Sequence, residues 1–158
     1  MILTGVSMLV VALDQFIKFF VLDSLQLNQS VSVWPDYFYL TYIQNRGTAF
    51  GFMSDLDPAF QIPFFVTITI AAALIVYSYQ RVIPEENLMP RVALGLIWGG
   101  TLSNFIDRLI YGKVIDFIDI HYGNIHGFIF NAADFFVTLG LLYLFFEFII
   151  KGKQKKIA

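Results

Sequence analysis

The sequence contains no cysteine and little charge. Asp, Glu, Lys and Arg together make up only 14% of its 158 residues, against about 25% in an average soluble domain. The lack of cysteine excludes disulfides, thiolate nucleophiles and cysteine metal ligands. The net charge of −2 gives no bulk attraction to nucleic acid, so we expect no nucleic-acid partner. The apolar share is 58%, which is typical of a membrane protein.

Four apolar stretches are each long enough to cross a bilayer as a helix, which takes about 20 mostly apolar residues. They lie at about 2–22, 60–79, 91–111 and 132–150. The first has no basic start, and no A-x-A cleavage site follows it, so we expect a retained helix and not a cleaved signal peptide. The sequence therefore predicts an α-helical integral membrane protein with four transmembrane helices, forming one domain over residues 1–158.

Basic residues predict the orientation of these helices. Four lysines lie in the tail at 151–158, and Arg81 and Arg91 bound the short loop at 80–90. Cytoplasmic flanks carry the excess of Lys and Arg, so we expect both termini and this loop in the cytoplasm. The segments 23–59 and 112–131 then lie on the outer side of the membrane.

Both outer segments contain strand-forming sequence. Residues 30–43, SVSVWPDYFYLTYI, are interrupted by a Trp-Pro-Asp turn, and residues 114–120, VIDFIDI, have a similar composition. Such runs predict short strands, and we expect a small extracytoplasmic β-sheet with aromatic anchors at the membrane interface. The glycine-containing stretch 45–52, NRGTAFGF, forms either a loop that wraps a bound chain over the site or an ordinary connection.

The ionisable residues of the predicted helices gather near their outer ends. Asp14 and Lys18 are one helical turn apart, and Asp134 lies in the first outer turn of the last helix. Asp116 follows the third helix on the same side. Charged residues inside a membrane helix are costly and usually mark function. Asp116 and Asp134 are the two acids that the outer segment can bring together from different elements.

Several of these residues also have a purely structural interpretation. Asp14 and Lys18 can neutralise each other, and Asp107 can pair with its neighbour Arg108. Asp134 can cap the last helix through the helix dipole.

Four other polar residues are not expected in the site. Asp119 is predicted to lie on a solvated strand face. His121 and His126 have no obvious third ligand, so no metal is expected. Ser103 has no histidine near it in the sequence, which leaves a Ser–His arrangement unsupported.

Four stretches follow one another in an order and spacing that are specific when taken together. They are LDQFIKFF at 13–20, YIQNRGTAFGF at 42–52, GGTLSNFIDRLIYGKVIDFIDI at 99–120 and FNAADFFVTLG at 130–140. In this series the chain resembles lipoprotein signal peptidase, also called signal peptidase II, of bacteria. Thr48 is one small departure, because the family commonly has alanine there.

The resemblance implies an aspartyl endopeptidase that needs no metal or cofactor and removes signal peptides from diacylglyceryl-modified prolipoproteins. It implies a catalytic pair at Asp116 and Asp134. The matching substrate-binding and supporting positions are Asn45, Asn104, Arg108 and Asn131, and the matching structural positions are Asp14, Lys18 and Asp107. It also implies three partners, namely lipidated prolipoproteins, membrane lipid and the inhibitor globomycin, and a site facing the outer leaflet of the bacterial inner membrane.

The residues alone leave two other classes of function open. A small multi-span transporter or channel with an outer-leaflet polar site would also bury Asp and Lys, although transporter halves often repeat. A scaffold subunit would not require the two acids. The peptidase hypothesis has a physical basis of its own, because two close carboxylates share one proton. One can then activate water while the other polarises the scissile carbonyl.

Overall fold

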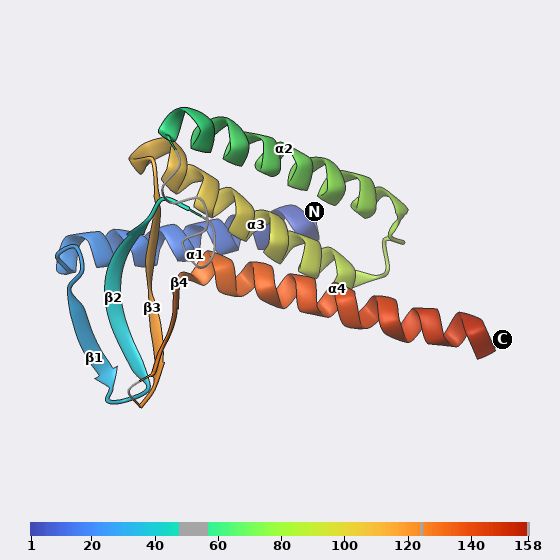
Figure 1. Cartoon of the computed structure of the whole chain (residues 1–158). Coiled ribbons are helices and arrows are strands. Elements are labelled where there is room, and N and C mark those ends of the chain that lie inside the picture. Colours follow the sequence, from blue (N-terminus) through green and yellow to red (C-terminus); the bar gives the residue numbers. More distant parts are fainter. Residues whose placement is uncertain (48–56, 124, 158) are drawn as a thin grey trace.

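Four helices form a bundle, and a small sheet extends from one end of it (Figure 1). The computed structural model describes residues 1–47, 57–123 and 125–157. The helices are α1 (Ile2–Ser24), α2 (Pro58–Val82), α3 (Leu88–Tyr111) and α4 (Ala132–Ile157). The two termini and the α2–α3 connection lie at the end of the bundle opposite the sheet (Figure 1).

The central helix of the bundle is α3, which contacts α1, α2 and α4. Two of its glycines allow close approach. A Cβ atom at Gly99 would lie 2.8 Å from the carbonyl oxygen of Ser7 in α1, and one at Gly100 would lie 2.4 Å from that of Ala133 in α4. Real Cβ atoms do not come this close, so the helix spacing on both sides of α3 requires glycine.

Within the described part of the chain, three helical stretches are long and apolar enough to cross a membrane, Ile2–Ser24, Ala59–Val82 and Ala132–Ile150. The prediction of a helical membrane protein is therefore confirmed for three of the four predicted transmembrane helices. The helix α3 is as long, at 24 residues, but it carries Asn104, Asp107 and Arg108 and is not among the three. Its central place accounts for this difference, because the other helices shield its polar residues.

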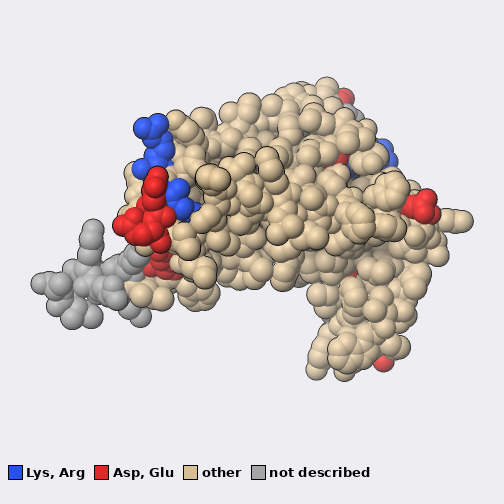
Figure 2. All heavy atoms as spheres, turned by 180° about the vertical axis from the view of Figure 1, so that it is seen from behind, with Lys and Arg blue, Asp and Glu red and all other residues tan. Residues whose placement is uncertain are grey.

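The outer surface agrees with a membrane location. Figure 2 shows the visible charged side chains gathered towards the two ends of the molecule, with a nearly uncharged belt between them. Many large apolar side chains are exposed on the helices, for example Phe19, Ile75 and Phe148. An apolar belt of this kind is what a protein surrounded by lipid presents.

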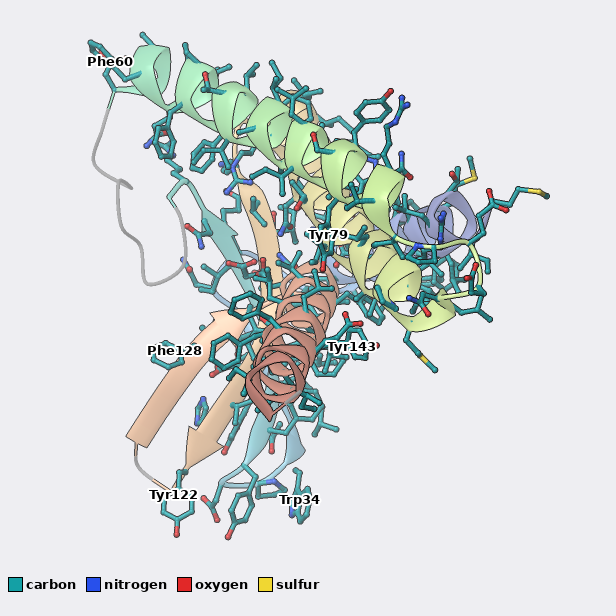
Figure 3. All side chains as sticks on the ribbon, turned by 90° about the vertical axis from the view of Figure 1, so that its right-hand side faces the viewer. Trp34, Phe60, Tyr79, Tyr122, Phe128 and Tyr143 are labelled. Atoms are coloured by element: carbon teal, nitrogen blue, oxygen red, sulfur yellow. The ribbon has the colours of Figure 1, made fainter. Side chains whose placement is uncertain are left out.

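The sheet is antiparallel with the strand order β1-β2-β3-β4. Its strands are β1 (Ser30–Trp34), β2 (Phe38–Asn45), β3 (Val114–Tyr122) and β4 (Ile125–Phe130), so the predicted strands in 30–43 and 114–120 are confirmed. Trp34 and Tyr122 project at the tip of the sheet farthest from the helices (Figure 3).

Two differences from the sequence analysis concern element bounds. Strand β4 was not predicted, because the apolar run around it is short and contains Gly127, although the Gly-Asn dipeptide at 123–124 is a turn signal. The last helix continues through the predicted tail to Ile157. Most of the 45–52 stretch, including Thr48 and Gly51, and the loop suggested to cover the site lie outside the described residues.

Candidate active site

Asp116 occupies the start of β3, close behind the end of α3. Gly112 terminates α3 with a left-handed φ of 70°, which glycine adopts without steric cost. The residues on either side of Asp116 are Ile115 and Phe117, and both are buried in the hydrophobic core. Asp116 is itself buried, so the strand holds a carboxyl group in largely apolar surroundings.

Asp134 sits in the first turn of α4 and takes part in its cap. The Asn131 side-chain Oδ1 accepts a hydrogen bond from the Asp134 backbone N–H at 2.9 Å. The Asp134 Oδ2 in return accepts one from the Asn131 backbone N–H at 3.3 Å. This reciprocal pattern is a capping box. The capping interpretation of Asp134 is therefore confirmed, and the cap fixes its carboxylate beside Asn131.

Two asparagines connect the two acids. Asn131 Nδ2 donates to Asp116 Oδ1 at 2.7 Å and to Asn104 Oδ1 at 3.0 Å. Asn104 Nδ2 donates to Asp134 Oδ1 at 2.8 Å. The strand β3 and the helices α3 and α4 thus present four polar side chains as one hydrogen-bonded group.

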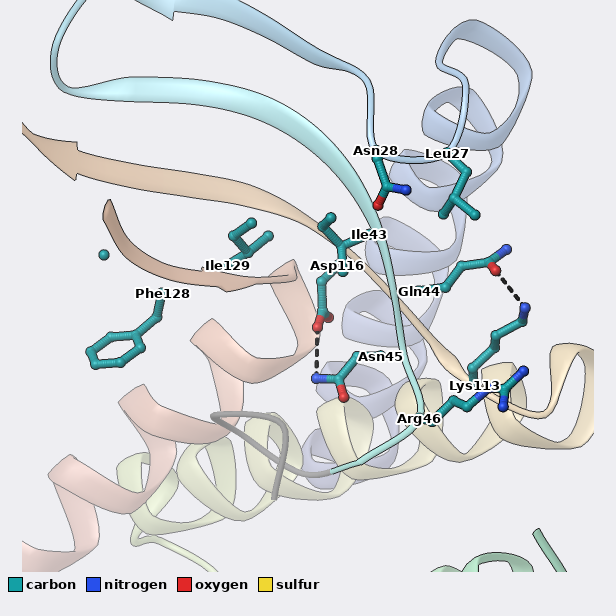
Figure 4. Close-up of a pocket in the computed structure, with 11 residues that line it drawn as sticks. Leu27, Asn28, Ile43, Gln44, Asn45, Arg46, Lys113, Asp116, Phe128 and Ile129 are labelled. Atoms are coloured by element: carbon teal, nitrogen blue, oxygen red, sulfur yellow. Dashed lines mark hydrogen bonds between the residues drawn. The ribbon is translucent and has the colours of Figure 1, made fainter. Parts of the chain in front are cut away.

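The two acids face a common cavity. A cavity of about 410 Å³ is lined by both carboxylates together with Asn45, Asn104 and Arg108. A second cavity of about 670 Å³ lies against the sheet and shares Asp116 and Asn45 with the first. Figure 4 shows this second cavity, where Asn45 Nδ2 donates to Asp116 Oδ2 at 3.0 Å. Asp116 therefore stands at the junction of the two hollows.

Arg108 borders the same cavity from α3. Its guanidinium carbon lies 3.7 Å from the centre of the Phe65 ring, and its Nη2 donates to the Gly47 carbonyl oxygen at 3.1 Å. Its Nε is buried and has no hydrogen-bond partner among the described residues. A buried donor of this kind is costly unless a ligand accepts from it.

The protonation of Asp116 is shifted by its surroundings. Burial is the largest cause and the nearby charge of Asp134 adds to it, and together they raise the pKa of Asp116 from 3.8 to about 6. The hydrogen bonds from Asn45 and Asn131 act in the opposite direction, because they favour the ionised carboxylate. A carboxylic acid with a raised pKa beside a second carboxylate is suited to sharing one proton with it.

A cluster of three charged side chains is buried next to the group formed by the two acids and the two asparagines. Lys18 Nζ lies 2.6 Å from Asp14 Oδ2 and 2.7 Å from Asp107 Oδ2. The predicted Asp14–Lys18 pair is therefore confirmed. The alternative in which Asp107 pairs with Arg108 is wrong, since its ion pair is with Lys18 of α1, across the helix interface.

The prediction that Asp119 is solvated is wrong. Asp119 is only 4% exposed. Its Oδ2 accepts a hydrogen bond from Thr41 Oγ1 at 2.6 Å, and its Oδ1 lies 2.7 Å from His121 Nε2. One of these partners, Thr41, comes from the neighbouring strand β2, which the local sequence could not indicate. Asp119 lines neither of the two cavities described above.

No group of three His, Asp or Glu side chains within the described ranges could hold a metal ion. His121 is engaged with Asp119, and its ring stacks on Tyr39 with the ring centres 4.4 Å apart.

The structure brings six of the predicted site residues together around the cavities, namely Asp116, Asp134, Asn45, Asn104, Arg108 and Asn131. It places the other three, Asp14, Lys18 and Asp107, in the layer beneath.

The sequence analysis missed two residues of this layer. Gln15 Nε2 donates to Asp107 Oδ1 at 2.7 Å, and Ser103 Oγ donates to Asp14 Oδ2 at 2.7 Å. Ser103 was considered only as a nucleophile. Its spacing of four residues before Asp107 was a usable signal, because residues four apart share a helix face.

Comparison with known proteins points in one direction. The family model described as signal peptidase II matches residues 6–150. A lipoprotein signal peptidase of Syntrophus aciditrophicus is 38% identical over 147 residues, which cover 93% of this chain and 91% of that protein. One of Bacillus subtilis is 37% identical over 153 residues and 96% of each chain.

A solved structure agrees with these sequence matches. It is titled as a bacterial membrane enzyme determined by the in meso method at 2.3 Å resolution, and it superposes with a TM-score of 0.84 at 30% identity. The match covers 95% of this chain and 88% of the other. The bundle and sheet described above therefore recur in a bacterial membrane enzyme.

Proposed function

Since this chain belongs to the signal peptidase II family, and is an aspartic peptidase that removes signal peptides from prolipoproteins, we propose that Asp116 and Asp134 are its catalytic pair. The observation that carries this proposal is Asn131, whose side chain donates to the Asp116 carboxylate and whose backbone N–H donates to the Asp134 carboxylate, at a cavity that both acids line. Family membership decides against the transporter, channel and scaffold alternatives.

In the proposed mechanism the pair holds one proton and a water molecule between its carboxyl groups. The ionised carboxylate takes a proton from the water as the water attacks the scissile carbonyl. The protonated carboxyl group polarises that carbonyl and later donates a proton to the leaving amine. The two acids titrate as a coupled pair, so neither has the base role alone. No metal or cofactor takes part in these steps.

Arg108 and Asn45 are proposed to hold the substrate backbone. The Nε of Arg108, for which the described residues offer no acceptor, is proposed to donate to a peptide carbonyl beside the scissile bond. Asn45 borders both cavities, so it can contact the chain on either side of that bond. The peptide antibiotic globomycin is proposed to inhibit by occupying the same space.

The two cavities suggest how a prolipoprotein lies across the pair. The cavity bounded by α3 and α4 adjoins the bilayer and suits the signal helix and the diacylglyceryl chains. The cavity against the sheet is lined by residues of β2, β3 and β4 and suits the mature part, which leaves the membrane. We propose that all four helices span the inner membrane of a bacterial cell, with the termini in the cytoplasm and the acids near the outer leaflet.

The direct test is single replacement of each acid by its neutral amide. We expect Asp116→Asn and Asp134→Asn to lower cleavage of a lipidated prolipoprotein by about 10⁴-fold or more, the scale on which loss of one member of a catalytic unit reduces turnover. Each variant should still accumulate in the membrane, because an amide fills the same volume. Cleavage is measured by the gel shift of the released product, with globomycin as the inhibited reference.

Asp119→Asn is the matched control. It is the same change on the same strand, three residues further along, at a buried acid that lines neither cavity. We expect this variant to cleave substrate. Near-normal turnover by Asp116→Asn or Asp134→Asn would refute the assignment.

A further inference from the structure

Lys18 is the centre of a charged cluster buried between α1 and α3. Lys18 is 1% exposed, and its partners Asp14 and Asp107 are 0% exposed. One positive and two negative groups at this depth are costly to bury. Close packing of α1 on α3 does not by itself require them, since Ser7 and Gly95 join the same two helices through a hydrogen bond and close contact.

Each acid of the cluster also accepts a backbone hydrogen bond. Asp107 Oδ2 accepts from the N–H of Ile115 at 3.1 Å. Asp14 Oδ1 accepts from the N–H of Ala133 at 2.9 Å. Ile115 immediately precedes Asp116, and Ala133 immediately precedes Asp134. The two acids paired to one lysine therefore hold the chain at the residue before each member of the proposed catalytic pair.

A third connection runs through side chains. Lys18 Nζ donates to Asn104 Oδ1 at 3.0 Å, and the amide group of Asn104 donates to Asp134 at 2.8 Å. Lys18 thus orients Asn104 with its oxygen inward and its donor group towards Asp134. All three connections lead from the cluster to the pair.

We propose that Lys18, Asp14 and Asp107 are positioning residues that set the distance between the two catalytic carboxylates by holding Ile115 and Ala133. This inference rests on the proposed function. Asp116 and Asp134 lie on different elements, β3 and α4, and the cluster bonds to the residue before each of them, so a change in the cluster would move the two acids relative to each other. Hydrogen bonds to ionised acceptors are about twice as strong as neutral ones, which explains why the anchor is charged.

Paired substitutions separate the anchor from the volume that it fills. Asp107→Leu keeps the size of the side chain and removes the acceptor for the Ile115 N–H, whereas Asp107→Asn keeps a neutral acceptor. We expect kcat to fall about 10²-fold for Asp107→Leu, as for a displacement of roughly 1 Å, and about tenfold for Asp107→Asn because its bond is weaker. The same order is expected for Asp14→Leu and Asp14→Asn.

The diagnostic measurement is the separation of kcat from KM. Among the described residues, no hydrogen bond joins Arg108 or Asn45 to Asp14 or Asp107, so KM should change less than kcat. Gly99→Ala is the structural control, because it disturbs the α1–α3 contact without touching either backbone N–H. It should lower the melting temperature, and the folded fraction should keep its kcat.

The outcomes distinguish the two proposals. Full activity of Asp116→Asn contradicts the catalytic pair itself. An inactive Asp116→Asn together with wild-type kcat in Asp107→Leu and Asp14→Leu overturns the positioning role alone. If the leucine variants do not fold, wild-type kcat in both asparagine variants overturns it as well. The positioning role is also contradicted if the Asp107 and Asp14 variants lose activity only in proportion to their loss of folded protein, as is expected for Gly99→Ala.

Discussion

Asp116 is a buried acid, and its neighbours have opposite effects on its pKa. Burial and the charge of Asp134 raise its pKa to about 6, while Asn45 and Asn131 donate hydrogen bonds that limit the rise. A raised pKa means that the folded enzyme keeps the proton above the ordinary range of a carboxylic acid. The shared proton of the pair is therefore retained in mildly acidic solution and lost as the pH rises through the upper pKa.

The pH dependence of cleavage follows from this. We expect kcat/KM, which reports the free enzyme, to fall as the pH rises through about 6. The corresponding fall in kcat should lie at higher pH, because bound substrate excludes more water from the acids and raises the pKa further. Both are measured as pH–rate profiles of a lipidated prolipoprotein.

Asn45→Leu sharpens the pH test. It removes the donor at 3.0 Å from Asp116 Oδ2, so the alkaline fall in kcat/KM should move to higher pH. An alkaline fall at the same pH as in the wild type would mean that another group controls it.

At the scale of elements, the site depends on how closely α3 and α4 approach. Asp134 lies in the first turn of α4, and Gly100 of α3 packs directly against the carbonyl oxygen of Ala133. The spacing of these two helices therefore determines where the Asp134 carboxylate lies relative to Asn104. The site is held by contacts between elements as much as by its own hydrogen bonds.

Gly100→Ala tests this dependence. The added Cβ would lie 2.4 Å from the Ala133 oxygen and 2.6 Å from Val137 Cγ2, so α4 must shift. We expect a loss of stability of about 1–3 kcal/mol, the usual cost of overpacking, and reduced cleavage by the protein that remains folded. Thermal unfolding in detergent and the cleavage assay measure the two effects.

Gly5→Ala is the matched helix control. Apart from the adjacent residues and the backbone of α1 itself, no atom of the described residues lies within 4 Å of a Cβ at Gly5, so the change should be neutral or stabilising by up to about 1 kcal/mol, through helix propensity. Equal stability and activity of Gly5→Ala and Gly100→Ala would show that the α3–α4 spacing is not critical.

At the scale of the whole molecule, the sheet and the termini lie at opposite ends of the bundle (Figure 1). If the helices cross the membrane, the sheet and the α2–α3 connection are on opposite sides of it. The absence of cysteine makes this simple to test, because any cysteine introduced is the only reactive thiol.

We expect Tyr122→Cys, at an exposed position near the tip of the sheet, to react with a membrane-impermeant maleimide in cells whose outer surface is accessible. Glu86→Cys, in the exposed α2–α3 connection, should react only after the membrane is permeabilised. The opposite pattern would reverse the proposed orientation, and labelling of both in intact cells would contradict a spanning bundle.

The sequence by itself predicted the helices, most of the sheet and the residues that line the candidate site. Apolar runs of sufficient length, a turn between two strand-like segments and a specific series of polar motifs are all local features. They predicted Asp116 and Asp134 as partners, and they predicted the Asp14–Lys18 pair because its residues are four apart on one helix.

The tertiary structure decided what depends on residues far apart in the chain. Asp119 is buried, and its hydrogen-bond donor Thr41, on the neighbouring strand β2, lies 78 positions away. Asp107 pairs with Lys18 across a helix interface, and Asp14 holds the N–H of Ala133, 119 positions further along. Buried polar groups must find partners wherever the packing places them, and no local pattern in the sequence specifies that placement.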